Sequence, residues 1–270
     1  MTILEAIILG IIQGATEFLP ISSSGHLVLV PTIFGLTQPN LNIIAVAHLG
    51  SLVAVLIYFR KELWAIITAV AEGLWKRDPL GEPDARLGWY IAGGSIPAAT
   101  AGLLFADTFD EIFGNPTAVA FFLLVTALLL VLGERLLTGI KTWAEMTWLD
   151  AIIIGLFQML ALFPGISRSG STITGGLWRG LDRETAARYS FLLGVPAILG
   201  AGLLSILDLQ RSGALASDWQ LLLAAFLAAA IVGYLCIYFL LAWLRSHSLY
   251  IFAAYCALLG GGYLLWTFFS

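Results

Sequence analysis

Two polar side chains within an apolar segment of the sequence have the types and spacing of cation ligands. Gln13 and Glu17 are four residues apart, so in a helix they lie on one face. A carboxylate oxygen and an amide oxygen are ligands that hard divalent cations prefer. This pair therefore predicts a site for Mg²⁺ or Ca²⁺.

A serine-rich segment directly after Glu17 carries groups that could begin a nucleophilic attack. Ser22, Ser23 and Ser24 are consecutive, and His26 lies three residues after Ser23. Within one turn of helix, the imidazole of His26 could activate a serine, or act itself as the nucleophile or base. Both alternatives, Ser23 and His26, stay open.

A second polar segment, residues 164–172, has the composition of an anion site. Unpaired N–H groups at the start of a helix attract anions, and the serine hydroxyls can add hydrogen bonds. Arg168 adds a full positive charge and a planar donor group that fits phosphate. We therefore predict that the ligand is a phosphate group and that its contacts are Ser22, Ser167, Arg168, Ser169 and Thr172.

The two polar segments are copies of one another. Residues 3–25 align with 148–170 without gaps, and 11 of these 23 pairs are identical, including glycine, glutamine and serine. Glu17, His26 and Arg168, in contrast, have no counterpart of the same type. One composite site, with the acid and the histidine from one segment and the arginine from the other, therefore fits the pattern better than two equivalent sites.

The overall composition indicates that these segments lie in a membrane protein. Of the 270 residues, 60% are hydrophobic and 11% are charged, against roughly 45–50% and about 25% in soluble domains. A soluble globule is therefore excluded, and we expect an all-α polytopic membrane protein with one membrane domain, residues 1–270. A span takes about 20 apolar residues, and six runs qualify: 42–59, 88–106, 116–133, 184–207, 219–243 and 249–268.

Two further apolar runs, 3–34 and 148–179, are each broken near the middle at a proline and predict re-entrant helical hairpins. Non-helical backbone at membrane depth must be buried by protein or line a wet cavity, so the two breaks point to the site. One hairpin and three spans make one repeat, about 1–140 and about 146–270. Because each repeat crosses the bilayer an odd number of times, the second is inverted, and the hairpin tips are expected to meet near mid-membrane.

The basic residues indicate the orientation of this inverted-topology repeat. With the predicted loop 60–87 placed in the cytoplasm, 11 of the 13 Lys and Arg residues lie on the cytoplasmic side. Arg211 falls on the outer side and Arg168 lies inside the second hairpin. Both termini are then outside, and the site is expected to open on the outer face of the membrane.

At these motifs the sequence resembles a known enzyme family. Residues 13–26, QGATEFLPISSSGH, resemble the (E/Q)xxxE region and the serine–histidine segment of undecaprenyl-diphosphatase, the bacterial bacitracin resistance protein. Residues 164–172, PGISRSGST, are similar to its PGxSRSxxT motif, and the likeness covers the length and arrangement of the whole chain. Gln13 stands at the first carboxylate position of the family pattern, which leaves Glu17 as the acidic residue of that pair.

The resemblance implies hydrolysis of undecaprenyl diphosphate to undecaprenyl phosphate and inorganic phosphate. This reaction recycles the lipid carrier of peptidoglycan synthesis at the periplasmic face of the bacterial inner membrane, and it confers bacitracin resistance. The resemblance also implies a divalent cation, metal-linked catalysis at Glu17, phosphate binding at Arg168 with Ser167 and Thr172, and a nucleophile or base at Ser23 or His26. The implied partners are the polyprenyl diphosphate and the bilayer, with no nucleic acid; a homodimer stays open.

A transporter or flippase of a polyprenyl phosphate is the alternative function, because broken helices in inverted repeats are typical of secondary transporters. The Ser23 and His26 pair and the asymmetry of the site favour an enzyme. A structural ion pair is the alternative role for Glu17 and Arg168. His48, which lies in an apolar span outside both motifs, is interpreted as forming an interhelical hydrogen bond.

Overall fold

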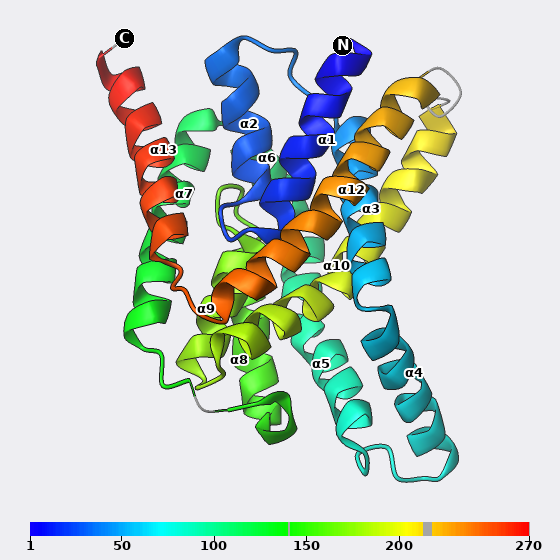
Figure 1. Ribbon diagram of the computed structural model, residues 1–270. Coiled ribbons are helices and arrows are strands. Elements are labelled where there is room, and N and C mark those ends of the chain that lie inside the picture. The colour runs from blue at the N-terminus through cyan, green and yellow to red at the C-terminus, as the bar shows by residue number, and fades with distance from the viewer. Residues whose placement is uncertain (140, 213–217, 270) are drawn as a thin grey trace.

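A computed structural model describes residues 1–139, 141–212 and 218–269 and shows a bundle of helices (Figure 1). Within these ranges no strand forms, apart from an isolated bridge between Lys141 and Leu181. The helices, in chain order, are α1 (Ile3–Phe18), α2 (Ser23–Phe34), α3 (Leu41–Tyr58), α4 (Arg60–Trp75), α5 (Pro83–Leu104), α6 (Ala106–Phe113), α7 (Pro116–Arg135), the short 3₁₀ helix η1 (Trp143–Glu145), α8 (Trp148–Leu160), α9 (Arg168–Trp178), α10 (Arg183–Ser212), α12 (Trp219–Leu244) and α13 (Tyr250–Phe269).

The long apolar helices correspond closely to the predicted spans. Within the described residues, five helices are long and apolar enough to cross a membrane: α3, α7, α10, α12 and α13. The pair α5 and α6, bent by 82°, gives a sixth if it counts as one span. The chain is therefore an all-helical, multi-pass membrane protein.

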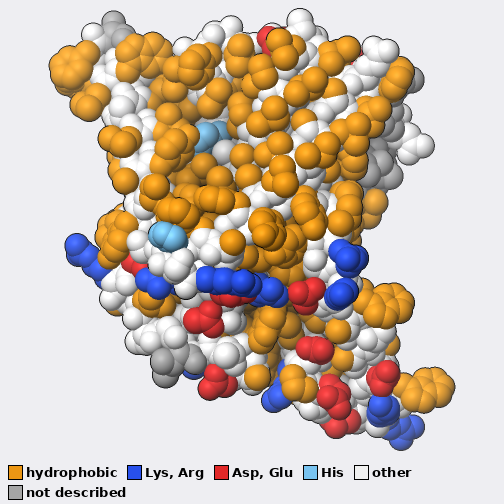
Figure 2. Space-filling view, in the orientation of Figure 1, with side chains coloured by type: hydrophobic (Ala, Val, Ile, Leu, Met, Phe, Trp, Pro, Cys, Tyr) orange, Lys and Arg blue, Asp and Glu red, His pale blue; other side chains and the backbone are white. Residues whose placement is uncertain are grey.

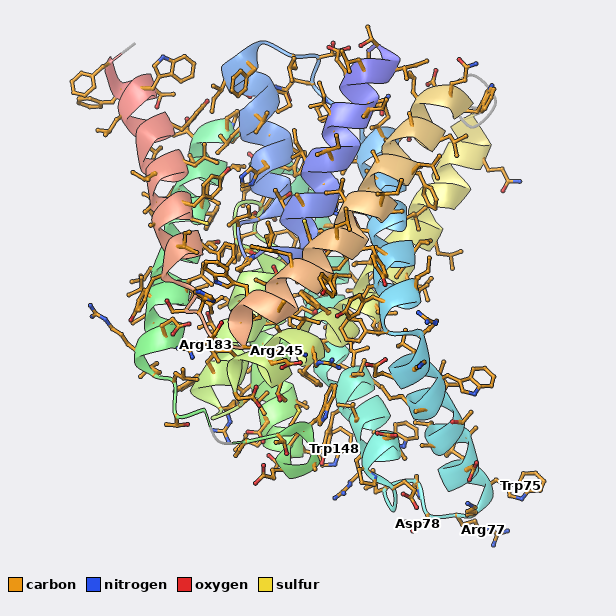
Figure 3. All side chains as sticks on the ribbon, in the orientation of Figure 1. Trp75, Arg77, Asp78, Trp148, Arg183 and Arg245 are labelled. Atoms are coloured by element: carbon orange, nitrogen blue, oxygen red, sulfur yellow. The ribbon has the colours of Figure 1, made fainter. Side chains whose placement is uncertain are left out.

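Most of the segment 60–87, predicted as a cytoplasmic loop between two spans, is helical. Helix α4 and the start of α5 form an arm that projects from the bundle, with Trp75, Arg77 and Asp78 at its tip (Figures 1 and 3). Ile66 is buried on α4, and Leu63 and Val70 pack against the same core. These three residues have the spacing of one helical face.

The arm lies at the end of the molecule opposite both chain termini (Figure 1). Figure 2 shows Lys and Arg side chains gathered toward that end, whereas hydrophobic side chains cover the part nearer the termini. Arg183 and Arg245, labelled in Figure 3, lie in this charged band and form ion pairs with Glu134 and Glu184 respectively. The side chain of Arg211, predicted on the opposite side, lies outside the described residues.

The two apolar runs predicted as hairpins are each divided into two helices. Helices α1 and α2 are joined by residues 19–22, and α8 and α9 by 161–167. Each second helix starts with a serine cap: the side chain of Ser22 accepts from the N–H of Gly25, and that of Ser167 accepts from the N–H of Gly170. Ser22 has a φ of 72°. This backbone conformation is unfavourable for any residue other than glycine, so the first tip is locally strained.

Candidate active site

The two hairpin tips contact each other through serines at equivalent positions of the duplication. The hydroxyl of Ser24 accepts from the N–H of Gly165 over 3.2 Å. In return, the hydroxyl of Ser169 donates to the carbonyl of Leu19 over 3.1 Å. The expected meeting of the tips is therefore present, while their depth in a bilayer stays a prediction.

Glu17 and Arg168 form an ion pair where the tips meet. Nη2 of Arg168 donates to Oε1 of Glu17 over 3.0 Å, and the side chains are 15% and 6% exposed. Glu17 lies in the last turn of α1 and Arg168 is the first residue of α9, so each helix break places one member of the pair. The structure thus brings together the acid and the arginine that the sequence assigned to one composite site.

Three further groups lie close to the second oxygen of the Glu17 carboxylate. Oε2 accepts from the amide of Gln13 over 2.9 Å and from the hydroxyl of Ser23 over 2.8 Å. Nε2 of His48 lies 3.6 Å from the same oxygen. The structure therefore brings Gln13, Glu17 and Ser23 together, and the direct partner of the Ser23 hydroxyl is a carboxylate.

His26 contacts Ser22 of the first tip and Tyr255 of α13. Its Nδ1 lies 2.7 Å from the carbonyl oxygen of Ser22, and its Nε2 lies 2.7 Å from the hydroxyl of Tyr255 on α13. Because a carbonyl only accepts, Nδ1 carries the proton and the neutral ring accepts the Tyr255 hydroxyl at Nε2. The polar contacts of His26 thus tie the first tip to α13, and its proposed role as nucleophile or base stays a prediction.

Residues of α10 hold Arg168 in place. Nη1 of Arg168 donates to the carbonyl of Ser190 over 3.0 Å, and the hydroxyls of Ser190 and Thr172 lie 2.6 Å apart. A Cβ at Gly194 would collide with the guanidinium, so this glycine makes room for it. Sequence reasoning missed Ser190 and Gly194.

The remaining predicted phosphate contacts have structural partners at the tips. Ser22 and Ser167 cap α2 and α9, Ser169 joins the tips, and Thr172 donates to the backbone carbonyl of Arg168 over 2.7 Å. These bonds preorganise the backbone around the Arg168 guanidinium. Contact of these four side chains with a phosphate stays a prediction.

The divalent cation expected beside Glu17 stays a prediction. Oε1 of Gln13 is buried without a hydrogen-bond partner, and it lies on the side chain whose amide nitrogen contacts Glu17. Among the described residues there is no group of three or more His, Cys, Asp or Glu that could hold a metal. A cation here would therefore take few ligands from protein carboxylates, as is usual for Mg²⁺ sites completed by water and phosphate oxygens.

A groove lies between α3 and α10, and His48 is one of its lining residues. The volume of the groove is about 370 Å³, and its lining residues are Leu41, Asn42, Ile44, Ala45, His48, Ile198, Ala201 and Gly202. The hydrogen bond of His48 is formed within its own helix, where Nδ1 lies 2.8 Å from the carbonyl oxygen of Ile44. Its contact with another helix is the approach of Nε2 to within 3.6 Å of Oε2 of Glu17. His48 therefore separates the groove from Glu17.

These features define a multi-pass helical membrane protein with a buried polar site assembled from two broken helices. The chain belongs to the bacitracin resistance protein BacA family, whose model matches residues 6–262.

Several curated relatives carry the name undecaprenyl-diphosphatase. The protein from Chlorobaculum tepidum is 47% identical over an alignment of 270 positions. The alignment covers 97% of this chain and 96% of the relative. The protein from Methanosphaera stadtmanae is 46% identical, with 96% of each chain covered. The protein from Chlorobium chlorochromatii is 45% identical and covers 96% of this chain and 95% of its own length.

Proposed function

We propose that this chain hydrolyses undecaprenyl diphosphate to undecaprenyl phosphate and inorganic phosphate. The reaction recycles the lipid carrier of cell-wall synthesis and accounts for resistance to bacitracin. Family membership and the name of the relatives support this activity. The structural observation that carries the proposal is the ion pair between Glu17 and Arg168, because it puts a phosphate-binding group beside a base where the two tips meet.

Arg168 binds the terminal phosphate in this proposal. Its Nη1 is fixed by the carbonyl of Ser190, whereas its Nε is buried without a protein partner. Nε and Nη2 form one edge of the guanidinium, and such an edge donates two parallel hydrogen bonds to a phosphate. In the complex, the phosphate therefore accepts the hydrogen bond that Nη2 donates to Glu17 in the free protein.

Ser23 is the nucleophile that the geometry favours. Its hydroxyl donates to Oε2 of Glu17 over 2.8 Å, so the carboxylate can accept its proton as the Ser23 oxygen attacks the terminal phosphorus. The bond from phosphorus to the bridging oxygen breaks, and undecaprenyl phosphate leaves with that oxygen and its electron pair. Water then hydrolyses the phosphoserine, which releases inorganic phosphate and restores the Ser23 hydroxyl.

A divalent cation held by Glu17 and Gln13 would neutralise charge on the diphosphate oxygens. The buried and unpartnered Oε1 of Gln13 supports this assignment. Arg168, oriented by Ser190, supplies the permanent positive charge of the site, and its fixed position lowers the cost of reorganisation when the phosphate arrives.

The proposed topology is an inverted repeat of six spans and two re-entrant hairpins, with both termini outside and the site open to the periplasm. Equivalent glycines of the duplication support it. A Cβ at Gly10 on α1 would collide with the backbone of Ala225 on α12, and one at Gly155 on α8 would collide with Gly94 on α5. Each hairpin thus packs closely on a span of the other repeat, and both termini lie at the end away from the charged band (Figures 1 and 2).

Phosphate release in detergent distinguishes this function from lipid transport. The purified chain is incubated with undecaprenyl diphosphate, with and without a chelator, and inorganic phosphate is measured. We expect release that stops with the chelator and returns with added Mg²⁺ or Ca²⁺. Tight binding of the lipid without phosphate release would favour the alternative, a flippase of a polyprenyl phosphate, which the broken helices also suit.

A further inference from the structure

The groove between α3 and α10 adjoins the site at one residue. His48 lines the groove from α3, and Nε2 of the same side chain lies 3.6 Å from Oε2 of Glu17. One ring therefore forms part of the groove wall and also contacts the carboxylate of the site. A diphosphate held at the site has the inner end of this groove beside it.

Small side chains create the hollow of the groove. Ala45 lines it from α3, and Ala201 and Gly202 line it from α10. At Gly200, on the same turn of α10, an added Cβ would meet no atom within 4 Å. The volume of about 370 Å³ falls in the range of roughly 300–1,000 Å³ that small-molecule sites have.

The groove runs along the first half of α3. Leu41, Ala45 and His48 have the spacing of one helical face, and a rise of about 1.5 Å per residue puts Leu41 about 10 Å from His48 along the helix axis. The other end of α3 continues into α4 and the arm, so the groove lies in the half of α3 that is nearer the chain termini (Figure 1).

The surface around the groove is apolar. Leu199 and Leu203, one turn apart on α10, are exposed, and so is Leu41 at the start of α3. Apart from Asn42 and His48, the lining residues are Leu, Ile, Ala and Gly. In a multi-pass membrane protein such a surface contacts lipid hydrocarbon, so an apolar chain can enter the groove sideways from the bilayer.

From this arrangement we infer that the groove between α3 and α10 binds the isoprene units of the prenyl tail that lie next to the diphosphate. The inference rests on the proposed function for the identity of the lipid. Bilayer hydrocarbon is as apolar as the lining residues, so moving the tail into the groove gains little hydrophobic free energy. The groove acts by orientation instead: it fixes the direction of the tail and with it the position of the terminal phosphorus beside Ser23.

A second apolar groove of the same volume provides the comparison. It also has about 370 Å³, lies between α3 and α12, and is lined by Ala54, Ile57, Ala230, Ile231, Tyr234 and Leu235. Its α3 residues lie beyond His48 in the direction of the arm. It therefore offers an apolar surface to lipids without including the residue that contacts Glu17.

Photoaffinity labelling of the unmodified chain tests the inference without a substitution. The probe is an undecaprenyl diphosphate analogue that carries a diazirine in the isoprene unit next to the diphosphate and a methylene group in place of the bridging oxygen between the two phosphorus atoms. We expect label within residues 41–48 and 198–202. Excess of the same analogue without the diazirine should remove this label, whereas an equal amount of phosphatidylglycerol should not.

Two matched substitutions give a second reading. Ala45→Trp fills the groove beside the site, and Ala230→Trp fills the comparison groove. We expect Ala45→Trp to lower kcat/KM for undecaprenyl diphosphate by about tenfold or more, because a displaced phosphorus reacts slowly. Ala230→Trp should stay close to the unmodified chain. The folded fraction of each variant is measured, and if Ala45→Trp does not fold, the labelling of the unmodified chain decides.

The outcomes separate this inference from the proposed function. Label confined to 54–57 and 230–235, label that phosphatidylglycerol removes equally well, or the absence of specific label would overturn the tail site. Full turnover by a folded Ala45→Trp variant would do the same, and in each case phosphate release by the unmodified chain still supports the proposed activity. If that chain releases no phosphate but the groove is labelled as expected, the tail site holds and the activity fails.

Discussion

The guanidinium of Arg168 and the carboxylate of Glu17 form an ion pair of 3.0 Å between residues that are 151 positions apart in the chain. Each belongs to a different broken helix, so the pair exists only when both tips are in place. A phosphate that binds the Nε and Nη2 edge of Arg168 must compete with Glu17 for one of these N–H groups. The pair therefore links assembly of the site to substrate binding.

Arg168→Lys keeps the positive charge and removes the planar edge. We expect turnover of undecaprenyl diphosphate to fall by about a hundredfold or more, since one preorganised donor at a developing charge contributes that much. Arg179→Lys is the matched control, because Arg179 pairs with Asp150 at the far end of the second hairpin. Phosphate release by both variants checks the prediction. Equal rates would show that Arg168 does not bind the phosphate.

Ser23→Ala and His26→Gln separate the two candidate nucleophiles. We expect Ser23→Ala to abolish turnover and His26→Gln to leave measurable turnover with a lower thermal stability, because His26 ties Ser22 to Tyr255. Ser95→Ala, which removes a hydroxyl bonded within α5, is the control. Rapid quenching of the unmodified chain with labelled substrate should trap phosphoserine at position 23; trapped phosphohistidine would assign the attack to His26 instead.

Gly194→Ala tests the positioning of Arg168 from α10. The added Cβ would collide with the guanidinium, so we expect a loss of turnover of tenfold or more, about 1.4 kcal/mol in the transition state, in a protein that still folds. Gly200→Ala lies on the same helix with open space around the new Cβ and should keep full activity. Loss of activity in both variants would point to a general effect on α10.

The sequence predicted the residues at the two tips because they lie within two local motifs. Gln13, Glu17 and Ser23 are close in the chain, and the duplication indicated that Arg168 would join them. Ser190, Gly194 and Tyr255 could not be predicted, since their roles depend on which helices pack on the tips. His48 did carry a signal, as an ionisable residue in an apolar span, but its partner lies on another helix.

The fold was predicted in a similar way. The spans followed from apolar runs of sufficient length, and the hairpin breaks followed from proline and serine. The α4 arm was missed because its uncharged stretch, residues 63–71, is shorter than a span and has charged residues on both sides. The pairing of α1 with α12 and of α8 with α5 depends on close contact at Gly10 and Gly155, which the local pattern alone does not specify.

Glu17→Gln is the most direct test of the central claim that the two tips form one site for diphosphate hydrolysis. The amide keeps the shape of the carboxylate but cannot accept the Ser23 proton or pair with the charge of Arg168. Initial rates of phosphate release from undecaprenyl diphosphate are measured at saturating divalent cation, with the folded fraction determined for each sample. We expect less than about 1% of the unmodified rate in a chain that still binds the lipid. A rate per folded molecule close to that of the unmodified chain would contradict it and leave Glu17 and Arg168 as a structural ion pair.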